Sequence, residues 1–180
     1  MPTVRTQTAI SNRRSRLAGF SLVEILVVVM VVLIIAAIAI PNLVHGKMRA
    51  NEAAAMASVK TINVAEALYH SAYPEVGYSG SLVNLGSHGT DCVKPTSTNA
   101  CLIMDEALTN GVKNGYVFEI VGDGNKPSSS YSVTASPESS VSGRCSVVSS
   151  ESGEVHMSLP GATVNNGSRS LGSASSGCDL

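Results

Sequence analysis

Residues 20–40 read FSLVEILVVVMVVLIIAAIAI and decide the architecture of the N-terminal part of the chain. The stretch is apolar except for Ser21 and Glu24. Extended to Val44, it spans about 37 Å as an α-helix, more than the roughly 30 Å hydrocarbon core of a bilayer. A single segment in lipid must be helical, because its backbone polar groups find no other partners there. Residues 20–44 therefore predict one transmembrane helix.

The segment before this helix, residues 1–19, is polar and basic. It carries four of the 12 Lys and Arg residues of the 180-residue chain and none of its 13 Asp and Glu residues. The positive-inside rule places such a segment in the cytoplasm and the rest of the chain outside. Without residues 1–19 the formal net charge would be −5, since 8 basic and 13 acidic side chains would remain. Basic residues are too sparse after Phe20 to indicate direct nucleic-acid binding.

Residues 45–73 continue as an amphipathic helix half. Pro74 ends the helix at or before Tyr73, so the two segments predict one helix of about 50 residues, about 80 Å long. We expect its polar sides to carry Lys47, Arg49, Glu52, Lys60 and Glu66. Its apolar residues recur at three- and four-residue steps: Ala55, Val59, Ile62, Ala65, Tyr69 and Tyr73.

Pro41 and Gly46 are the weak points of this helix. Proline lacks the N–H that would bond the carbonyl of Ala37, and its ring crowds that carbonyl. Glycine in a helix interior costs about 1 kcal/mol relative to alanine. We expect a bend or a local loss of helix between Ala36 and Gly46, with Ala50–Tyr69 regular.

The rest of the chain predicts a loop followed by a sheet. Residues 74–115 form a Gly- and Ser-rich connecting loop with a short helix over 100–109. Strand-like runs follow at 116–121, 131–136, 144–149 and 154–158, separated by turn-forming residues. Their short connections favour an antiparallel meander, one face of which packs against residues 50–73. The predicted fold is α+β, with a long N-terminal helix on a sheet of about four strands within residues 116–180.

All four cysteines follow residue 90, an even set that fits an exported region. Cys92 and Cys101 lack the short Cys-x-x-Cys spacing of zinc sites, which favours a disulfide. Of three connectivities we expect Cys92–Cys101 and Cys145–Cys178. The first closes a small loop, and the second ties the Gly/Ser/Asn-rich end of the chain to a strand.

Enzyme motifs are absent from the sequence: it has no Gly-x-Ser-x-Gly, no P-loop and no His-Glu-x-x-His. We therefore expect neither enzymatic activity nor a cofactor. Gly122 and Gly124 predict a hairpin turn, with a calcium site at Asp123 and Asn125 as the alternative.

Three further patterns have a simple structural interpretation. Glu66 and His70 share a helix face and are expected to form a surface pair. Tyr69 and Tyr73 are expected to pack between helix and sheet rather than to form an aromatic path for electrons. The serine-rich stretch 127–180 indicates a solvated surface, with O-glycosylation as an alternative.

The junction Gly19-Phe20-Ser21-Leu22-Val23-Glu24 resembles the class III signal of type IV pilins and their relatives, which include the pseudopilins of type II secretion. A Gly–Phe bond, a glutamate four residues beyond the Phe, an apolar run and the proline at its end occur together. The resemblance extends more weakly over the whole chain. One departure is the absence of a glycine in mid-span, where the sequence reads Val31-Val32-Leu33-Ile34.

This resemblance implies cleavage after Gly19 by a prepilin peptidase and N-methylation of Phe20. The subunit would wait in the bacterial inner membrane and then enter a helical filament through an inner-membrane assembly platform, with further copies of itself and minor pilins as partners. Glu24 would neutralise the Phe20 ammonium of a neighbouring subunit, which would explain a carboxylate in an apolar helix and fix the axial register.

The expected function is that of a structural subunit of a type IV pilus-like extracellular filament. One alternative is a type II secretion pseudopilin, which uses the same N-terminal chemistry in a short periplasmic assembly. Another is a membrane-anchored monomer whose sheet binds a ligand. The sequence leaves open whether the subunit is major or minor, and whether it serves adhesion or motility.

Overall fold

The computed structural model describes residues 20–87, 92, 94–159 and 178. The expected leader, with Gly19, lies outside these residues, as does most of the chain after residue 159. Two compact parts meet at the bond between Ile40 and Pro41. The elements confirm the α+β class, and their order is α1 (Leu22–Ala72), α2 (Leu82–Leu85), α3 (Glu106–Thr109), β1 (Val112–Lys113), β2 (Tyr116–Gly122), β3 (Tyr131–Pro137), β4 (Ser146–Ser150) and β5 (Val155–Ser158).

The first element, α1, is one helix of 51 residues that ends one residue before the predicted limit at Tyr73. Pro41 lies inside it, and the helix runs through both Pro41 and Gly46 without interruption. The expected loss of helix is therefore wrong. A proline removes one backbone hydrogen bond, and the bonds of the turns on either side preserve the helix. The expected bend stays a prediction.

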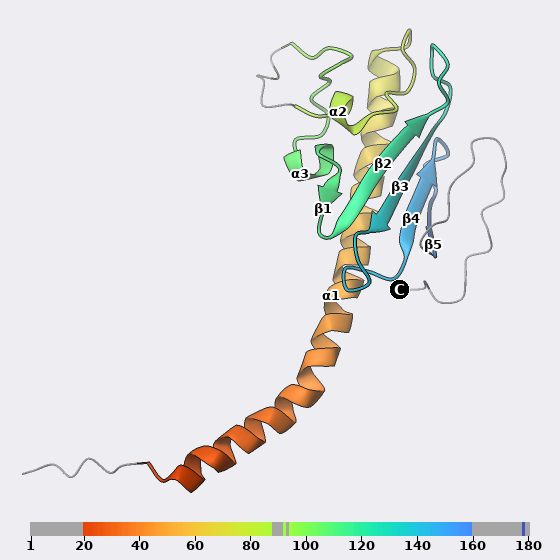
Figure 1. Cartoon of the computed structure of the whole chain (residues 1–180). Helices are drawn as coiled ribbons and strands as arrows, with labels where there is room; N and C mark the ends of the chain where they lie inside the picture. Colours follow the sequence, from red (N-terminus) through yellow and green to blue (C-terminus); the bar gives the residue numbers. More distant parts are fainter. Residues whose placement is uncertain (1–19, 88–91, 93, 160–177, 179–180) are drawn as a thin grey trace, which may run out of the picture. The chain divides into compact units, whose positions relative to one another are not determined.

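The five strands form one antiparallel sheet in the order β1-β2-β3-β4-β5, a meander as predicted (Figure 1). The two-residue strand β1 was missed by the sequence analysis. It pairs with β2 through a turn at Asn114 and Gly115, where both residues have positive φ, 52° and 74°. An Asn-Gly pair favours this turn, because Asn tolerates and Gly readily adopts that conformation. The third predicted strand, 144–149, corresponds to β4, which begins at Ser146 rather than at Arg144.

The core lies between one face of the sheet and the second half of α1, as predicted (Figure 1). In β2 buried and exposed residues alternate, because successive side chains of a strand point to opposite faces. Tyr73 is only half-buried at the edge of this core. Its central members are Ala55, Val59, Ile62, Ala65 and Tyr69 on α1, and Phe118, Ile120, Val133, Ala135 and Val147 on the sheet.

The connecting loop differs from the prediction, since the helix expected over 100–109 is confined to α3. The backbone N–H groups of Ala100 and Ile103 donate instead to the carbonyls of Asn84 and Leu85, at 2.8 and 2.9 Å. These bonds hold residues 100–103 against α2 and its C-terminal end. Asp105 then begins the helix, because its side chain accepts a hydrogen bond from a backbone N–H of the first turn.

Two disulfides are present, Cys92–Cys101 and Cys145–Cys178, which is the expected connectivity. The first links two residues of the connecting loop. The second joins the residue just before β4 to a residue near the end of the chain. Among the described residues no cysteine is free.

Candidate assembly site

The apolar surface of residues 20–40 is exposed. Every large apolar side chain from Leu22 to Ile40 is at least half exposed, and Phe20 is 77% exposed. In the part of the chain that the structure describes, α1 is the one helix long and apolar enough, by length and composition, to cross a membrane. An apolar surface of this size needs lipid or another protein to cover it.

Glu24 lies in the first turn of α1, four residues after Phe20. The carbonyl of Ser21 accepts hydrogen bonds from the backbone N–H groups of Glu24 and Ile25, at 3.0 and 3.3 Å. The carboxylate is thus at the helix N-terminus, where unpaired N–H groups and the helix dipole favour negative charge. Neither ion pair found among the described residues includes Glu24.

This arrangement combines an uncovered apolar helix with one acidic side chain near its start. Transfer of such a carboxylate into an apolar environment is costly unless a cation or several hydrogen-bond donors accompany it. Within residues 20–40 no Lys, Arg or His is available for that role. A countercharge for a fully enclosed Glu24 must therefore come from outside residues 20–40 or from another molecule.

The second half of α1 buries two glutamates that the sequence analysis placed on its polar sides. Glu52 is 7% exposed, and its Oε1 accepts a hydrogen bond from the backbone N–H of Arg144 at 2.7 Å. Glu66 is fully buried, and its Oε2 accepts from the backbone N–H of Ser79 at 2.8 Å. In both cases the carboxylate binds the backbone of a loop that covers the helix.

The expected surface pair of Glu66 with His70 is therefore wrong. His70 is exposed, and its ring packs on that of Tyr78, with centroids 4.7 Å apart. A signal for the burial of Glu66 was present in the sequence. Glu66 is four residues after Ile62 and three before Tyr69, so it belongs to the apolar stripe.

Burial raises the pKa of Glu66 to about 7, an effect only partly offset by hydrogen bonds from the backbone of Ser79 and Gly80. Its Oε1 is buried without a hydrogen-bond partner. The ionised form is thus poorly accommodated at this position.

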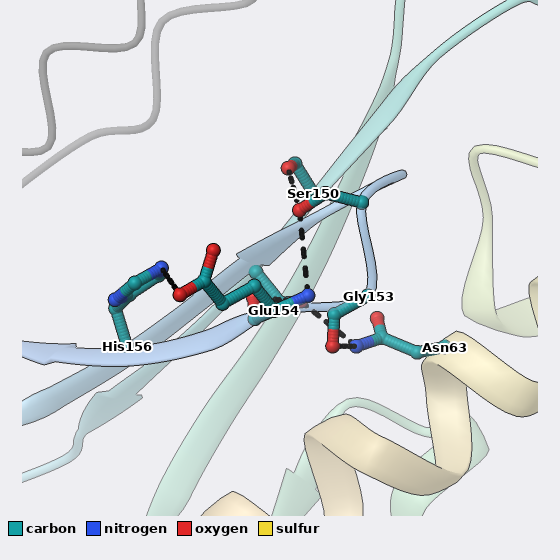
Figure 2. A network of polar contacts seen from close by, with 7 residues as sticks. Asn63, Ser150, Gly153, Glu154 and His156 are labelled. Atoms are coloured by element: carbon teal, nitrogen blue, oxygen red, sulfur yellow. Dashed lines mark hydrogen bonds and ion pairs between the residues drawn. The ribbon is translucent and has the colours of Figure 1, made fainter.

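Asn63 connects α1 to two strands and to the turn after β4. Its Nδ2 donates to Ser149 Oγ at 2.8 Å and to the carbonyl of Gly153 at 3.4 Å, and its Oδ1 accepts from the Tyr131 hydroxyl at 3.2 Å. Figure 2 shows the turn end of this network, where the amide of Asn63 points at Gly153. Asn63 was not among the residues expected to be buried, although it stands four residues after the apolar Val59.

Tyr69 of α1 and Tyr73, one residue after the end of α1, both pack in or against the core. Tyr69 is part of the core, and its ring centroid lies 4.9 Å from that of Tyr73. The Tyr69 hydroxyl donates to the carbonyl of Ser97 at 2.7 Å, which anchors the connecting loop to the helix. Tyr69 therefore joins three layers: helix, sheet and loop.

The turn between β2 and β3 is a hairpin organised by Asp123. Its carboxylate accepts hydrogen bonds from the backbone N–H groups of Asn125 and Ser129, both at 3.0 Å, and from the hydroxyls of Ser128 and Ser129, at 2.9 and 2.6 Å. These bonds hold the pKa of Asp123 well below its usual range, with the Ser129 hydroxyl contributing most. They engage both carboxylate oxygens of Asp123. In the described ranges no group of three or more His, Cys, Asp or Glu side chains could hold a metal ion.

Comparison with known proteins gives no relative. No protein-family model, no curated protein and no solved structure matches this chain.

Proposed function

We propose that the chain is a structural subunit of a type IV pilus-like filament. One observation carries the proposal: the uncovered apolar surface of residues 20–40 bears a single acidic residue in the first turn of its helix, four residues after the Phe of a Gly–Phe junction. A membrane anchor requires only the apolar surface, and its function does not account for Glu24. Side-by-side packing of several copies accounts for both the apolar surface and Glu24.

In this proposal, cleavage between Gly19 and Phe20 creates an ammonium group at Phe20, which is then N-methylated. In the bundle of apolar helices, the Glu24 carboxylate of one subunit accepts hydrogen bonds from the Phe20 ammonium of its neighbour. An ion pair is stronger in this low-dielectric environment than in water, and each charge would be costly there without the other. The requirement for both charges sets the axial offset between neighbouring helices.

The remaining part of the chain forms the outer surface of the filament in this proposal. Two disulfides cross-link this part, which is typical of proteins outside the cytoplasm. Its sheet is packed on α1. Before assembly the chain spans the inner membrane once, with residues 1–19 in the cytoplasm. The partners are further copies of the chain, minor pilins, the prepilin peptidase and the inner-membrane assembly platform, and the subunit itself has no enzymatic activity.

Replacement of Glu24 by Val tests the proposal. Membrane insertion should be intact or improved because a charge is removed, whereas the yield of filaments sheared from cells should fall at least tenfold, since the Phe20 ammonium loses its partner. Val28→Leu, one helical turn away, is the matched control and should leave both quantities unchanged.

A normal filament yield from Glu24→Val would show that Glu24 merely reaches the membrane surface. Absence of the wild-type chain from sheared filaments, together with its recovery in the membrane as a monomer, would favour an anchored binding module. Its recovery only in a short periplasmic assembly would favour a pseudopilin.

A further inference from the structure

The segment 77–81 is held between α1 and the end of the β2–β3 hairpin. On the hairpin side, Tyr78 N–H donates to the Ser128 carbonyl at 3.1 Å, and Ser128 N–H donates to the Val76 carbonyl at 2.8 Å. Gly80 lies so close to the hairpin that a Cβ built on it would be 3.1 Å from the backbone nitrogen of Gly122. Backbone contacts thus fix the segment and the preceding Val76 to the hairpin.

On the helix side, Ser79 is held by a carboxyl group. Its backbone N–H donates to Glu66 Oε2 at 2.8 Å, while Glu66 Oε1 has no hydrogen-bond partner in the buried interior. A carboxylate with one oxygen unsatisfied and out of reach of water is costly, whereas the neutral acid is much less so.

We propose that Glu66 is a pH-sensitive latch: the neutral carboxyl holds residues 77–81 closed on α1, and its ionisation favours opening of the segment so that water reaches the carboxylate. This inference is independent of the proposed filament function. It concerns the start of the connecting loop, whose surface changes when the segment opens.

The groups around Glu66 support this assignment. The titratable side chains that interact with it electrostatically are Tyr69 of α1 and Tyr131 of β3, and burial raises the pKa of both hydroxyls, so they remain neutral when Glu66 titrates. In the described part of the chain no Lys, Arg or His contributes a countercharge, which leaves burial as the dominant influence and the pKa of Glu66 at about 7.

The test uses the full-length chain in detergent micelles and measures the exchange protection factor of the Ser79 amide, relative to the intrinsic exchange rate at each pH. Between about pH 5.5 and about pH 8.5, linkage predicts at least a tenfold fall in protection. Glu66→Gln keeps an oxygen acceptor but cannot ionise, so its protection should be the same at both values. Equal protection of the wild-type amide at both values, or an equal fall in wild type and Glu66→Gln, overturns the proposal.

Two control variants separate Glu66 from other titrating groups. Glu52→Gln removes the other buried carboxylate that accepts a loop N–H, and it should preserve the fall in protection at Ser79. His70→Gln should preserve it as well, which excludes the imidazole that packs on Tyr78. Loss of the fall in either variant contradicts the assignment.

A measurement on the wild type alone covers the case in which Glu66→Gln does not fold. The carboxyl carbon of Glu66 should show a chemical-shift change centred near pH 7 in a ¹³C titration. A midpoint near the ordinary pKa of 4.5 would refute the latch.

Discussion

Asn63 on α1 and Ser149 on β4, 86 positions apart in the chain, are joined by a buried hydrogen bond of 2.8 Å. The same Asn63 side chain accepts a hydrogen bond from Tyr131 on β3. A polar side chain in an apolar interface is satisfied only when both strands are opposite the correct turn of the helix. This relationship therefore fixes the register of α1 on the sheet.

Replacement of Asn63 by Ala should lower the free energy of unfolding by about 2–3 kcal/mol, because the buried Tyr131 hydroxyl loses its acceptor and Ser149 loses a donor. Thr61→Ala is the control. The Thr61 hydroxyl is exposed and donates to the Ala57 carbonyl in its own helix, so the change should be within about 0.5 kcal/mol. Denaturant unfolding of the full chain in micelles measures both, and equal values for the two variants would contradict this role.

The helix–sheet core predicts a contrast between two neighbouring apolar positions. Ile62 is fully buried, whereas Val64 is 61% exposed on the other side of α1. Ile62→Ala should destabilise the protein by about 2–5 kcal/mol through lost contacts and a cavity. Val64→Ala should change stability by less than about 0.5 kcal/mol. A large effect at Val64 would mean that this face of α1 is covered in the protein under test.

Stability should decrease as the pH rises through the range in which Glu66 titrates. The folded pKa of about 7 lies above the ordinary value of 4.5, so the folded state retains the proton over this range while the unfolded state loses it. The free energy of unfolding therefore falls by at most about 3 kcal/mol between about pH 4.5 and pH 7. Thermal unfolding of wild type and Glu66→Gln measures the difference, and Glu66→Gln should lack this component. If the stability difference between wild type and Glu66→Gln stays constant across this pH range, Glu66 does not cause the pH dependence.

The two disulfides should contribute unequally to stability. Loop-closure entropy assigns about 3–4 kcal/mol to Cys145–Cys178, whose sequence separation is 33, and about 1 kcal/mol less to Cys92–Cys101, whose separation is 9. The double variants Cys145→Ser/Cys178→Ser and Cys92→Ser/Cys101→Ser provide the comparison by denaturant unfolding. Peptide mapping without reduction checks the connectivity, and a peptide linking Cys92 to Cys145 or Cys178 would overturn it.

Local patterns predict much of this fold. The three- and four-residue spacing of Ala55, Val59 and Ile62 identifies the buried face of α1, since that spacing places side chains on one side of a helix. The hairpins follow from short apolar runs separated by turn residues. The continuity of α1 through Pro41 could not be derived in the same way, because the propensity of one residue is outweighed by the hydrogen bonds around it.

The polar contacts of the core could be predicted only in part. Glu52, Asn63 and Glu66 lie within the apolar stripe, so their spacing indicates burial, but their identity as polar residues favours solvent. The hydrogen-bond partners of these buried side chains are the backbone N–H groups of Ser79 and Arg144 and the side chains of Tyr131 and Ser149. These partners lie beside the helix only in the folded chain, so the sequence pattern alone does not reveal them. Phe20 and Glu24, the residues proposed for assembly, are indicated by their motif alone. Their proposed partner is another copy of the chain, which the structure of a single chain does not display.

Mass spectrometry of the mature N-terminus in sheared filaments tests the filament proposal most directly. The filaments should contain this chain, with an N-terminal peptide that begins at Phe20, carries one methyl group and lacks residues 1–19. Assembled material that begins at Met1 would contradict processing at Gly19 and Phe20, and with it the ion pair between Phe20 and Glu24 on which the proposed assembly depends.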